Sequence, residues 1–265
     1  MDKIYKPGIY ENISIEEYKS IHALNKSSMV AVAQSPNAYH RYKLKERKLS
    51  KSLALGIAID MLLFTPAQFY LNFKKHPLKT PREYKVDETR TIYYIHPDDW
   101  QKIENMHIAL KEHKICSSIL SSGRSQLTLI WNDQEHGFLC KARPDWTCDD
   151  IHIMADLKTT KNADKKYFSY DADRYKYMWQ AAWYVEGMAA LTGETYQFVF
   201  ICIENTDQYV TKEQIAVYRA PEIEIQAALS EMEQAKRNYV RYLSGDRSGF
   251  AQNIEDLYLK TRTIV

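Results

Sequence analysis

The amino-acid sequence predicts an α/β fold, in which a central mixed sheet is flanked by helices and preceded by a mainly helical region. Helix-start signals and helical apolar patterns occupy the chain up to about residue 123, and β-type apolar runs begin at residue 124. From there the expected order is β-β-β-α-β-β-α, which is typical of an α/β domain. We therefore expect a single domain over 1–265, with 1–123 as its mainly helical part and 124–265 as its α/β core.

The composition indicates a substantial apolar core and no strong net charge. The 265 residues are 45% hydrophobic and 26% charged, and 36 basic against 34 acidic side chains give a net charge of +2. A globally basic nucleic-acid binder is not indicated, so any nucleic-acid contact must come from local patches. The longest apolar run, 53–64, is too short to span a bilayer, and the four scattered cysteines suggest reduced thiols. We expect a cytoplasmic protein with no membrane association.

The N-terminal region contains start signals for successive helices. Hydroxyl side chains stand where helices are expected to begin, namely at Ser14 (with Glu17 as its capping-box partner), at Ser27 and Ser28, and at Ser35–Pro36. The run 53–63 is apolar on all sides and predicts a buried helix. Residues 71–95 contain prolines and many charges, so they predict a loop or flap. A further helix is expected from His96 to about Leu120.

The C-terminal half reads as strands with two helices between and after them. Strands are expected at 127–131, 138–146, 151–159, 196–204 and 209–219, with a turn at 132–137. A long helix is expected over about 173–191 and ends at Gly193, because glycine readily adopts the left-handed conformation of a helix end. A second, amphipathic helix is expected over 221–244.

Two carboxylates and one amine form the most informative pattern. Side chains two apart on a strand share a face, so Asp156 and Lys158 project together, and Asp145 ends the preceding strand of the expected hairpin. This group is costly to hold together unless a cation neutralises it. Mg²⁺ prefers carboxylate oxygens and keeps water molecules that can act as nucleophiles, while the ammonium of Lys158 can orient that water or offset phosphate charge. The pattern indicates phosphodiester hydrolysis, although a D-x-K triplet alone is common on surface strands.

Two neighbouring features strengthen this interpretation. Gln180 and Tyr184 lie four residues apart, on one face of the helix expected after the D-x-K strand. Asp60 is a carboxylate within an otherwise apolar helix, and a buried carboxylate favours a metal or a cationic partner. The alternatives are that Gln180 and Tyr184 are polar edges of a packed helix and that Asp60 pairs with a lysine.

Taken in order along the chain, these segments resemble the PD-(D/E)XK nuclease superfamily, in particular its RecE-like exonucleases. The resemblance covers most of the chain. The segments that carry it are Gly8-Ile9-Tyr10, Leu24-Asn25-Lys26-Ser27, Ser35-Pro36, Leu55-Gly56-Ile57-Ala58-Ile59-Asp60, Phe138-Leu139-Cys140-Lys141-Ala142-Arg143-Pro144-Asp145, Asp156-Leu157-Lys158-Thr159-Thr160, and Gln180 with Tyr184 as a QxxxY motif.

The resemblance implies a role for each matching residue. Asp145 and Asp156 would be metal ligands, with the Leu157 carbonyl as another, and Lys158 would be the catalytic lysine. Gln180 and Tyr184 would hold the DNA backbone or the local geometry of the site. The implied metal is Mg²⁺, with Mn²⁺ as a substitute.

The chain departs from the family pattern at two positions. Asp60 stands where the family usually has histidine, and an aspartate there can ligate Mg²⁺ more naturally than an imidazole. Gln126 stands where the family often has an acidic residue on its first strand, which reduces the number of carboxylates. Gln126 could still support a bound water.

Basic and hydroxyl residues near these motifs are candidates for DNA contact. Lys26, Ser27 and Ser28 begin an expected helix, whose backbone amides could hold a terminal phosphate. Lys161 follows the D-x-K strand directly. A run of basic residues over 41–51 is a further candidate for phosphate contact, although such runs are usually solvated faces.

The resemblance implies a bacterial or phage-encoded exodeoxyribonuclease that acts on double-stranded DNA ends in the 5′→3′ direction. Its products would be 3′ single-stranded tails for recombination with a RecT-like annealing protein, and its assembly a ring-shaped trimer or tetramer. Two alternatives stay open: an endonuclease or CRISPR-adaptation-type nuclease of the same superfamily, and an inactive DNA-end-binding scaffold.

Overall fold

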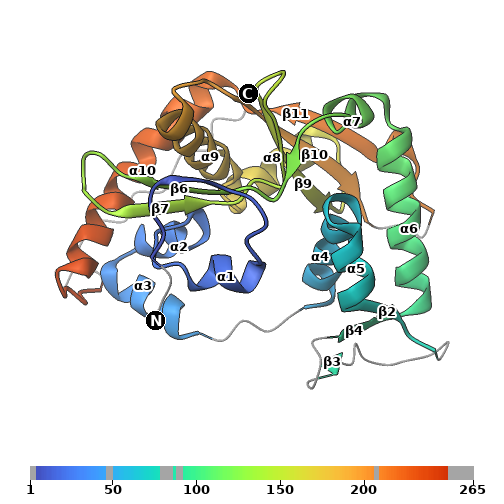
Figure 1. Cartoon of the computed structure of the whole chain (residues 1–265), viewed down its shortest axis with the longest axis horizontal. Helices are drawn as coiled ribbons and strands as arrows, with labels where there is room; N and C mark the ends of the chain where they lie inside the picture. The colour runs from blue at the N-terminus through green and yellow to red at the C-terminus, as the bar shows by residue number, and fades with distance from the viewer. Residues whose placement is uncertain (1–3, 46–49, 78–85, 88–91, 206–208, 250–265) are drawn as a thin grey trace.

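The computed structural model describes residues 4–45, 50–77, 86–87, 92–205 and 209–249. Figure 1 shows a central sheet with α9 and α10 on one side and α4, α5 and α6 on the other. The helices are α1 (Ile15–Ser20), α2 (Lys26–Val32), α3 (Pro36–Leu44), α4 (Lys51–Phe64), α5 (Pro66–Asn72), α6 (Pro97–Glu112), α7 (Lys114–Ile119), α8 (Lys165–Arg174), α9 (Tyr177–Thr192) and α10 (Glu222–Leu243), with a 3₁₀ turn η1 at Lys212–Gln214. The predicted α/β class, with its mainly helical N-terminal region, is confirmed.

Within the described ranges, the strands form three sheets. They are β1 (Gly8–Tyr10), β2 (Phe73–Lys75), β3 (Val86–Asp87), β4 (Ile92–Ile95), β5 (Arg124–Ser125), β6 (Thr128–Asn132), β7 (Leu139–Ala142), β8 (Trp146–Cys148), β9 (Ile153–Thr160), β10 (Gln197–Glu204) and β11 (Ile215–Arg219). The central sheet has the order β11-β10-β9-β8-β5, and the others have the orders β1-β6-β7 and β2-β4-β3. In the central sheet β9 and β10 run parallel and the remaining pairs are antiparallel, so the sheet is mixed as predicted.

The N-terminal capping signals are confirmed in two places and corrected in one. The Ser14 hydroxyl accepts from the Glu17 amide at 3.1 Å, and the Ser35 hydroxyl caps α3. The second helix, however, begins at Lys26 with Asn25 as its cap, rather than after Ser27 and Ser28. Ser28 is the third helical residue and closes the capping box with Asn25, because its hydroxyl accepts from the Asn25 amide at 3.2 Å.

Two connections in the N-terminal half differ from the predictions. The expected loop over 71–95 contains a small sheet instead, made of β2, β3 and β4; residues 78–85 and 88–91 lie outside the described residues. The helix expected up to Leu120 is divided at His113. The backbone of His113 is extended, and its imidazole accepts from the Cys116 amide at 3.3 Å, so it ends α6 and caps α7.

Two elements of the C-terminal half also differ from the predictions. The strand expected over 138–146 is two strands in different sheets, since Pro144 interrupts the chain between β7 and β8 and proline cannot donate to a ladder. The helix expected over about 173–191 is α9, which begins at Tyr177. It is preceded by α8, which was not predicted, and Lys176 in the left-handed conformation (φ 54°) separates the two helices. The predicted end at Gly193 is confirmed, with φ 76°.

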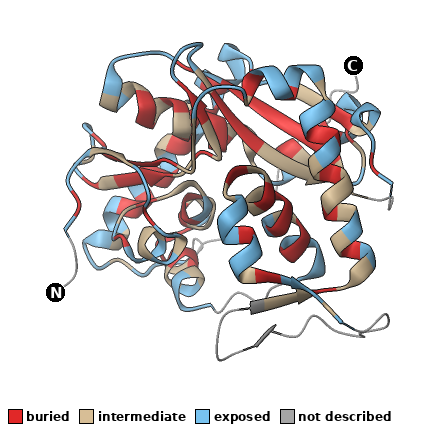
Figure 2. Ribbon diagram, turned by 45° about the vertical axis from the view of Figure 1, so that its right-hand side comes forward, coloured by how far each residue is buried: buried red, intermediate tan, exposed pale blue. Residues whose placement is uncertain are grey.

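Strand β10 is buried on both faces and separates two parts of the core. Phe198, Phe200 and Cys202 pack toward α9 and α10, while Val199, Ile201 and Ile203 pack against the layer that contains α4 and α6. Figure 2 shows the buried central strands between the buried faces of these helices. In the neighbouring β9, Asp156 pairs with Phe200 and Lys158 with Cys202, so the D-x-K side chains share the α9 face of the sheet.

Candidate active site

The β8–β9 hairpin places Asp145 beside the D-x-K strand. The pairing between these strands ends at Trp146 and Ala155, so Asp145 lies just beyond the last pair, rather than at the end of one continuous strand. Beyond this pair the Leu157 amide donates to Oδ2 of Asp145 at 2.9 Å. The backbone N–H and C=O of one strand residue point toward the same neighbour, so the Leu157 carbonyl is directed toward the same side.

Asp156, Lys158 and Gln180 form a closed set of polar contacts. Nζ of Lys158 donates to Oδ2 of Asp156 and, at 2.9 Å, to Oε1 of Gln180. Nε2 of Gln180 donates in turn to Oδ1 of Asp156. The side chains are well enclosed, with 15% of Lys158 and 5% of Asp156 exposed. Gln180 is therefore placed to hold the local geometry of the acid and the amine.

Asp60 reaches this region from α4. Both of its carboxylate oxygens face Nε2 of Gln126, at 3.2 and 3.4 Å. Oε1 of Gln126 accepts from Nε of Arg143 at 2.9 Å, and the Gln126 amide donates to the Asp145 carbonyl at 3.0 Å. Gln126 thus links Asp60 to the backbone of Asp145, and among the described residues no lysine forms an ion pair with Asp60.

Burial and the neighbouring acids perturb the titration of these carboxylates. Burial, with the charge of Asp156, raises the pKa of Asp60 to about 7. Burial also raises the pKa of Asp145 well above its usual range, with contributions from the charges of Asp156 and Asp60. Burial acts to lower the pKa of Lys158, but the charges of Asp156 and Asp145 outweigh it and raise that pKa. The three aspartates therefore repel one another, and Lys158 is held as an ammonium.

The chemistry of this donor set fits a hard divalent cation. Carboxylates and a backbone carbonyl are the oxygen ligands that Mg²⁺ prefers, and a cation would relieve the repulsion among Asp60, Asp145 and Asp156. Their ligand atoms are not gathered within 4.8 Å of one another; among the described residues the group that meets this distance is Glu135, His136 and Glu233. That group lies at the β6–β7 turn and on α10, where Nδ1 of His136 is 2.9 Å from Oδ1 of Asp133.

The second residue of the QxxxY motif lies on the same helix face as Gln180. The Tyr184 ring is half-buried and packs edge-on against Phe198, with ring centroids 5.8 Å apart. Burial raises the pKa of Tyr184 well above its usual range, whereas its hydrogen bond with Gln180 acts in the opposite direction. Tyr184 therefore remains a neutral phenol that supports Gln180.

The candidate DNA-contacting residues occupy different environments. Nζ of Lys26 donates to the Tyr175 carbonyl at 2.7 Å, and burial together with the charge of Lys158 lowers the pKa of Lys26 to about 8. Ser27 and Lys161 are exposed, but Ser28 is buried and its hydroxyl serves the α2 capping box. The structure thus brings Lys26 to the site and does not offer the Ser28 hydroxyl to a ligand. Within the basic run 41–51, residues 46–49 lie outside the described residues.

Two residues that the sequence reasoning did not single out complete the site. Arg143 holds Gln126 and also donates from Nη1 to the Ile13 carbonyl at 2.7 Å. The Tyr177 ring lies 4.7 Å from Nζ of Lys158. The sequence offered a signal for each of them. Arg143 precedes Asp145 by two residues, and Tyr177 precedes Gln180 by three, which places Tyr177 on the same helix face as Gln180.

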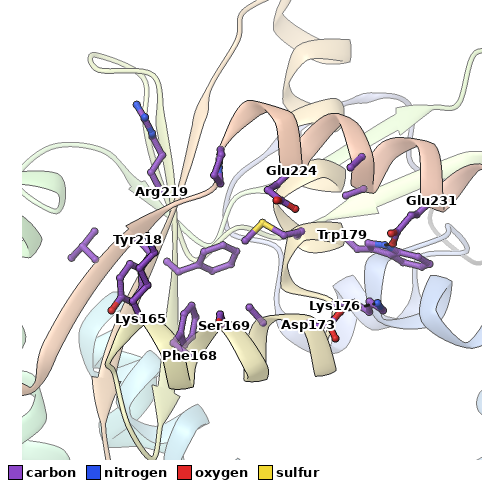
Figure 3. A pocket seen from close by; sticks show the side chains of 17 residues that line it. Lys165, Phe168, Ser169, Asp173, Lys176, Trp179, Tyr218, Arg219, Glu224 and Glu231 are labelled. Carbon is purple, nitrogen blue, oxygen red and sulfur yellow. Dashed lines mark hydrogen bonds and ion pairs between the residues drawn. The ribbon is translucent and has the colours of Figure 1, made fainter. Parts of the chain in front are cut away.

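A cavity of about 730 Å³ lies on another side of α9, between α8, α10 and β11. Figure 3 shows Trp179, Tyr218 and Phe168 among the side chains around it. Its lining includes none of Asp145, Asp156 and Lys158, so it is separate from the candidate active site.

The chain is similar to a protein family and to several solved structures. A family model described as a PDDEXK-like domain of unknown function (DUF3799) matches residues 16–253. A crystal structure of a candidate exonuclease from Eubacterium rectale is similar with a TM-score of 0.63 and 17% identity, over 89% of this chain and 88% of that chain. The similarity to this structure supports the fold. The comparison with curated proteins gives no match.

Two further structures are more distant. A phage-related exonuclease from Haemophilus somnus 129PT has a TM-score of 0.38 and 11% identity, over 84% of this chain and 96% of that chain. An alkaline exonuclease from Laribacter hongkongensis has a TM-score of 0.31 and 13% identity, over 86% and 96%. These two TM-scores are too low to establish a shared fold. The family match, in contrast, spans most of the chain and agrees with the predicted PD-(D/E)XK resemblance, and it shows that this protein belongs to the family of PDDEXK-like domains (DUF3799).

Proposed function

We propose that this protein is a metal-dependent exodeoxyribonuclease, which hydrolyses phosphodiester bonds at the ends of double-stranded DNA. The observation that carries the proposal is the closed set of contacts among Asp156, Lys158 and Gln180, with the Asp145 carboxylate beside it. An isolated Asp/Lys pair on a surface strand would need neither a buried amide bridging both groups nor a second buried carboxylate. Family membership supports the same chemistry.

In this proposal Asp145, Asp156 and the Leu157 carbonyl hold Mg²⁺ or Mn²⁺, with Asp60 as a further ligand. When bound, such a cation supplies Lewis-acid activation of the phosphodiester and of water. Lys158 presents a positive charge and N–H donors to the non-bridging oxygens of the scissile phosphate or to the attacking water. Gln180 holds the Lys158 ammonium and the Asp156 carboxylate in place relative to each other, and Tyr184 supports Gln180.

Phosphate contacts outside the reacting centre are assigned to Lys26, Ser27 and Lys161. Lys26 lies close enough to Lys158 for the two charges to interact, so both amines can face one phosphodiester backbone. Lys161 is exposed directly after β9. The proposal includes, from the family resemblance, 5′→3′ polarity, a ring-shaped trimer or tetramer, and a RecT-like annealing partner for the 3′ tails.

Digestion of linear and covalently closed circular duplex DNA, with Mg²⁺ and with EDTA, tests this function. We expect the linear substrate alone to shorten, only with metal, and Lys158→Ala to lower the rate by at least about a hundredfold because it removes the positioned charge. Lys212→Ala, an exposed lysine on η1, is the matched control and should digest at the wild-type rate.

Other outcomes point to the remaining candidates. Cleavage of closed circles would assign an endonuclease. Binding of DNA ends without cleavage in any metal would assign a scaffold and contradict the proposal.

A further inference from the structure

We propose that Tyr177 is a positioning residue, whose ring face holds the ammonium of Lys158 between Asp156 and Gln180. The inference rests on the proposed nuclease function for its kinetic consequence, but the arrangement itself can be tested without DNA. It concerns a residue outside the D-x-K and QxxxY motifs.

The Tyr177 ring provides a third contact to the ammonium of Lys158. An ammonium carries three N–H donors, and that of Lys158 donates to Asp156 and to Gln180. The Tyr177 ring centroid lies 4.7 Å from Nζ, within the range of an attractive cation–π contact. Only 15% of the Lys158 side chain is exposed, so water screens this attraction less than it would at the surface.

The ring of Tyr177 is itself fixed by other aromatic side chains. Its centroid lies 5.7 Å from that of Phe168 and 5.8 Å from those of Phe200 and Tyr175. Phe168, which is labelled in Figure 3, and Phe200 also line the cavity between α8, α10 and β11. The aromatic contacts restrict the ring, so its face stays directed at Lys158 instead of following the motion of the amine.

A second lysine anchors the turn from which Tyr177 begins α9. Nζ of Lys26 donates to the Tyr175 carbonyl at 2.7 Å and lies 5.8 Å from the Tyr177 ring centroid. Lys176, between the two tyrosines, has φ 54°, which costs energy for a residue with a side chain. The bond from Lys26 therefore holds a strained turn, and it connects α2 to the position of the ring.

The Tyr177 ring also lies close to two positive charges, those of Lys26 and Lys158. Lys26 and Lys158 both lie over Tyr177, and their ammonium groups repel each other. The negative face of an aromatic ring stabilises both cations without forming a salt bridge that would withdraw Lys158 from Asp156. We therefore expect loss of the ring to displace Lys158 more than Lys26, because the bond to the Tyr175 carbonyl still anchors Lys26, so that DNA binding changes little.

The kinetic experiment compares aromatic with aliphatic substitutions. Tyr177→Phe and Tyr177→Trp keep a ring face and should retain the wild-type kcat on linear duplex DNA. Tyr177→Leu and the more flexible Tyr177→Met should lower kcat about tenfold with KM unchanged, as the loss of a partly desolvated cation–π contact implies. Tyr170→Leu, which removes an exposed ring on α8, is the control and should leave kcat within twofold of the wild type.

An NMR experiment on the protein labelled with ¹³C at lysine Cε separates this inference from the nuclease proposal. The Lys158 signal, assigned with Lys158→Ala, should be shifted by the ring current in the wild type and in Tyr177→Phe. It should move to an ordinary lysine position in Tyr177→Leu and Tyr177→Met. A wild type that shifts in this way but digests no DNA would contradict the proposed function alone. An unshifted wild-type signal, or wild-type kcat in both aliphatic variants, would overturn the positioning role.

Discussion

Asp60 is a half-buried carboxylate in the otherwise apolar helix α4, at a position where the sequence resemblance predicts a histidine. Its carboxylate faces Gln126 with both oxygens, and its pKa of about 7 reflects burial and the nearby Asp156. An oxygen ligand at this position suits Mg²⁺, whereas Mn²⁺ and the later first-row metals accept an imidazole more readily than Mg²⁺ does. The identity of this one side chain is therefore expected to influence the choice of metal.

Asp60→His should change the metal preference of the nuclease. We expect the rate with Mg²⁺ to fall by about tenfold or more while the rate with Mn²⁺ is largely kept, because a nitrogen ligand replaces an oxygen. The measurement is the ratio of the Mn²⁺ and Mg²⁺ rates on linear duplex DNA. Asp60→Asn, which removes the charge without adding an imidazole, should lower both rates. An unchanged ratio in Asp60→His would show that residue 60 does not contact the metal.

The contacts among Asp156, Lys158 and Gln180 could be predicted from the sequence because each residue carries a local signal. The period-two spacing of Asp156 and Lys158 and the four-residue spacing of Gln180 and Tyr184 follow from strand and helix geometry alone. The contacts of Gln126 could not be predicted in this way. The Gln126 side chain donates a hydrogen bond to Asp60, 66 positions away in the sequence. Its φ of 54° lies in the left-handed region, which is usually predicted only where a glycine stands.

Helix α9 determines how the site is assembled, because it lies against both β9 and β6. It presents Gln180 and Tyr184 to β9, and on another side its Gly187 lies against the Trp131 ring of β6. A Cβ added at Gly187 would lie 2.7 Å from a Trp131 ring carbon, closer than real contacts allow. The absence of a side chain at this position therefore sets the distance between α9 and the β6 strand.

Gly187→Ala should consequently destabilise the protein, although alanine is the better helix former. Overpacking against a buried tryptophan costs about 1–3 kcal/mol, which exceeds the gain of about 1 kcal/mol in helix propensity. Urea denaturation should show a free energy of unfolding lower by about 1–2 kcal/mol.

The matched control for this substitution is Gly56→Ala in α4. There the new Cβ would meet Oγ1 of Thr159 at 3.4 Å, which is ordinary contact, so stability should be unchanged or higher. Equal stabilisation by both substitutions would show that α9 can move away from β6 without cost.

The element boundaries that the sequence did not predict have tertiary causes. Strand β1 has three residues and no alternation of its own, and it forms by pairing with β6 more than a hundred positions later. The break between α8 and α9 falls at Lys176, with neither glycine nor proline, and the bond from Lys26 to the Tyr175 carbonyl holds it. By contrast, the Ser35–Pro36 start and the Gly193 end are local signals and were predicted.

For the molecule as a whole, α10 is tied to the β6–β7 turn by buried charges. Lys236 on α10 is 2.9 Å from Oδ2 of Asp133 and 2.8 Å from Oε1 of Glu186 on α9. Asp133 also accepts from the His136 amide at 2.8 Å. Among the described residues, no helix combines the length and apolar character needed to cross a bilayer.

The Asp133–Lys236 pair should make stability depend on pH in the acid range. Burial alone would raise the pKa of Asp133, but hydrogen bonds from Lys236 and the His136 backbone outweigh it and lower that pKa. The stabilisation from ionised Asp133 is therefore present above about pH 4, the ordinary aspartate range, and is lost as pH falls through the lower folded value.

Asp133→Asn tests this dependence, because it removes one of the two carboxylates that pair with the buried Lys236 and leaves Glu186 as the other. We expect the free energy of unfolding to fall by about 2 kcal/mol at pH 7, the usual range for a hydrogen bond to a charged group. The difference from the wild type should shrink as the pH falls below 4 toward the lowered pKa of Asp133, where the folded wild type is protonated as well. Urea denaturation of both proteins at pH 7, 5, 4 and 3 measures this difference, and comparison at each pH removes contributions that the two share. Asp150→Asn, in an exposed turn, should show a small and constant difference. A large difference that stays constant down to pH 3 would mean that the packing of residue 133, rather than its charge, ties α10 to the sheet.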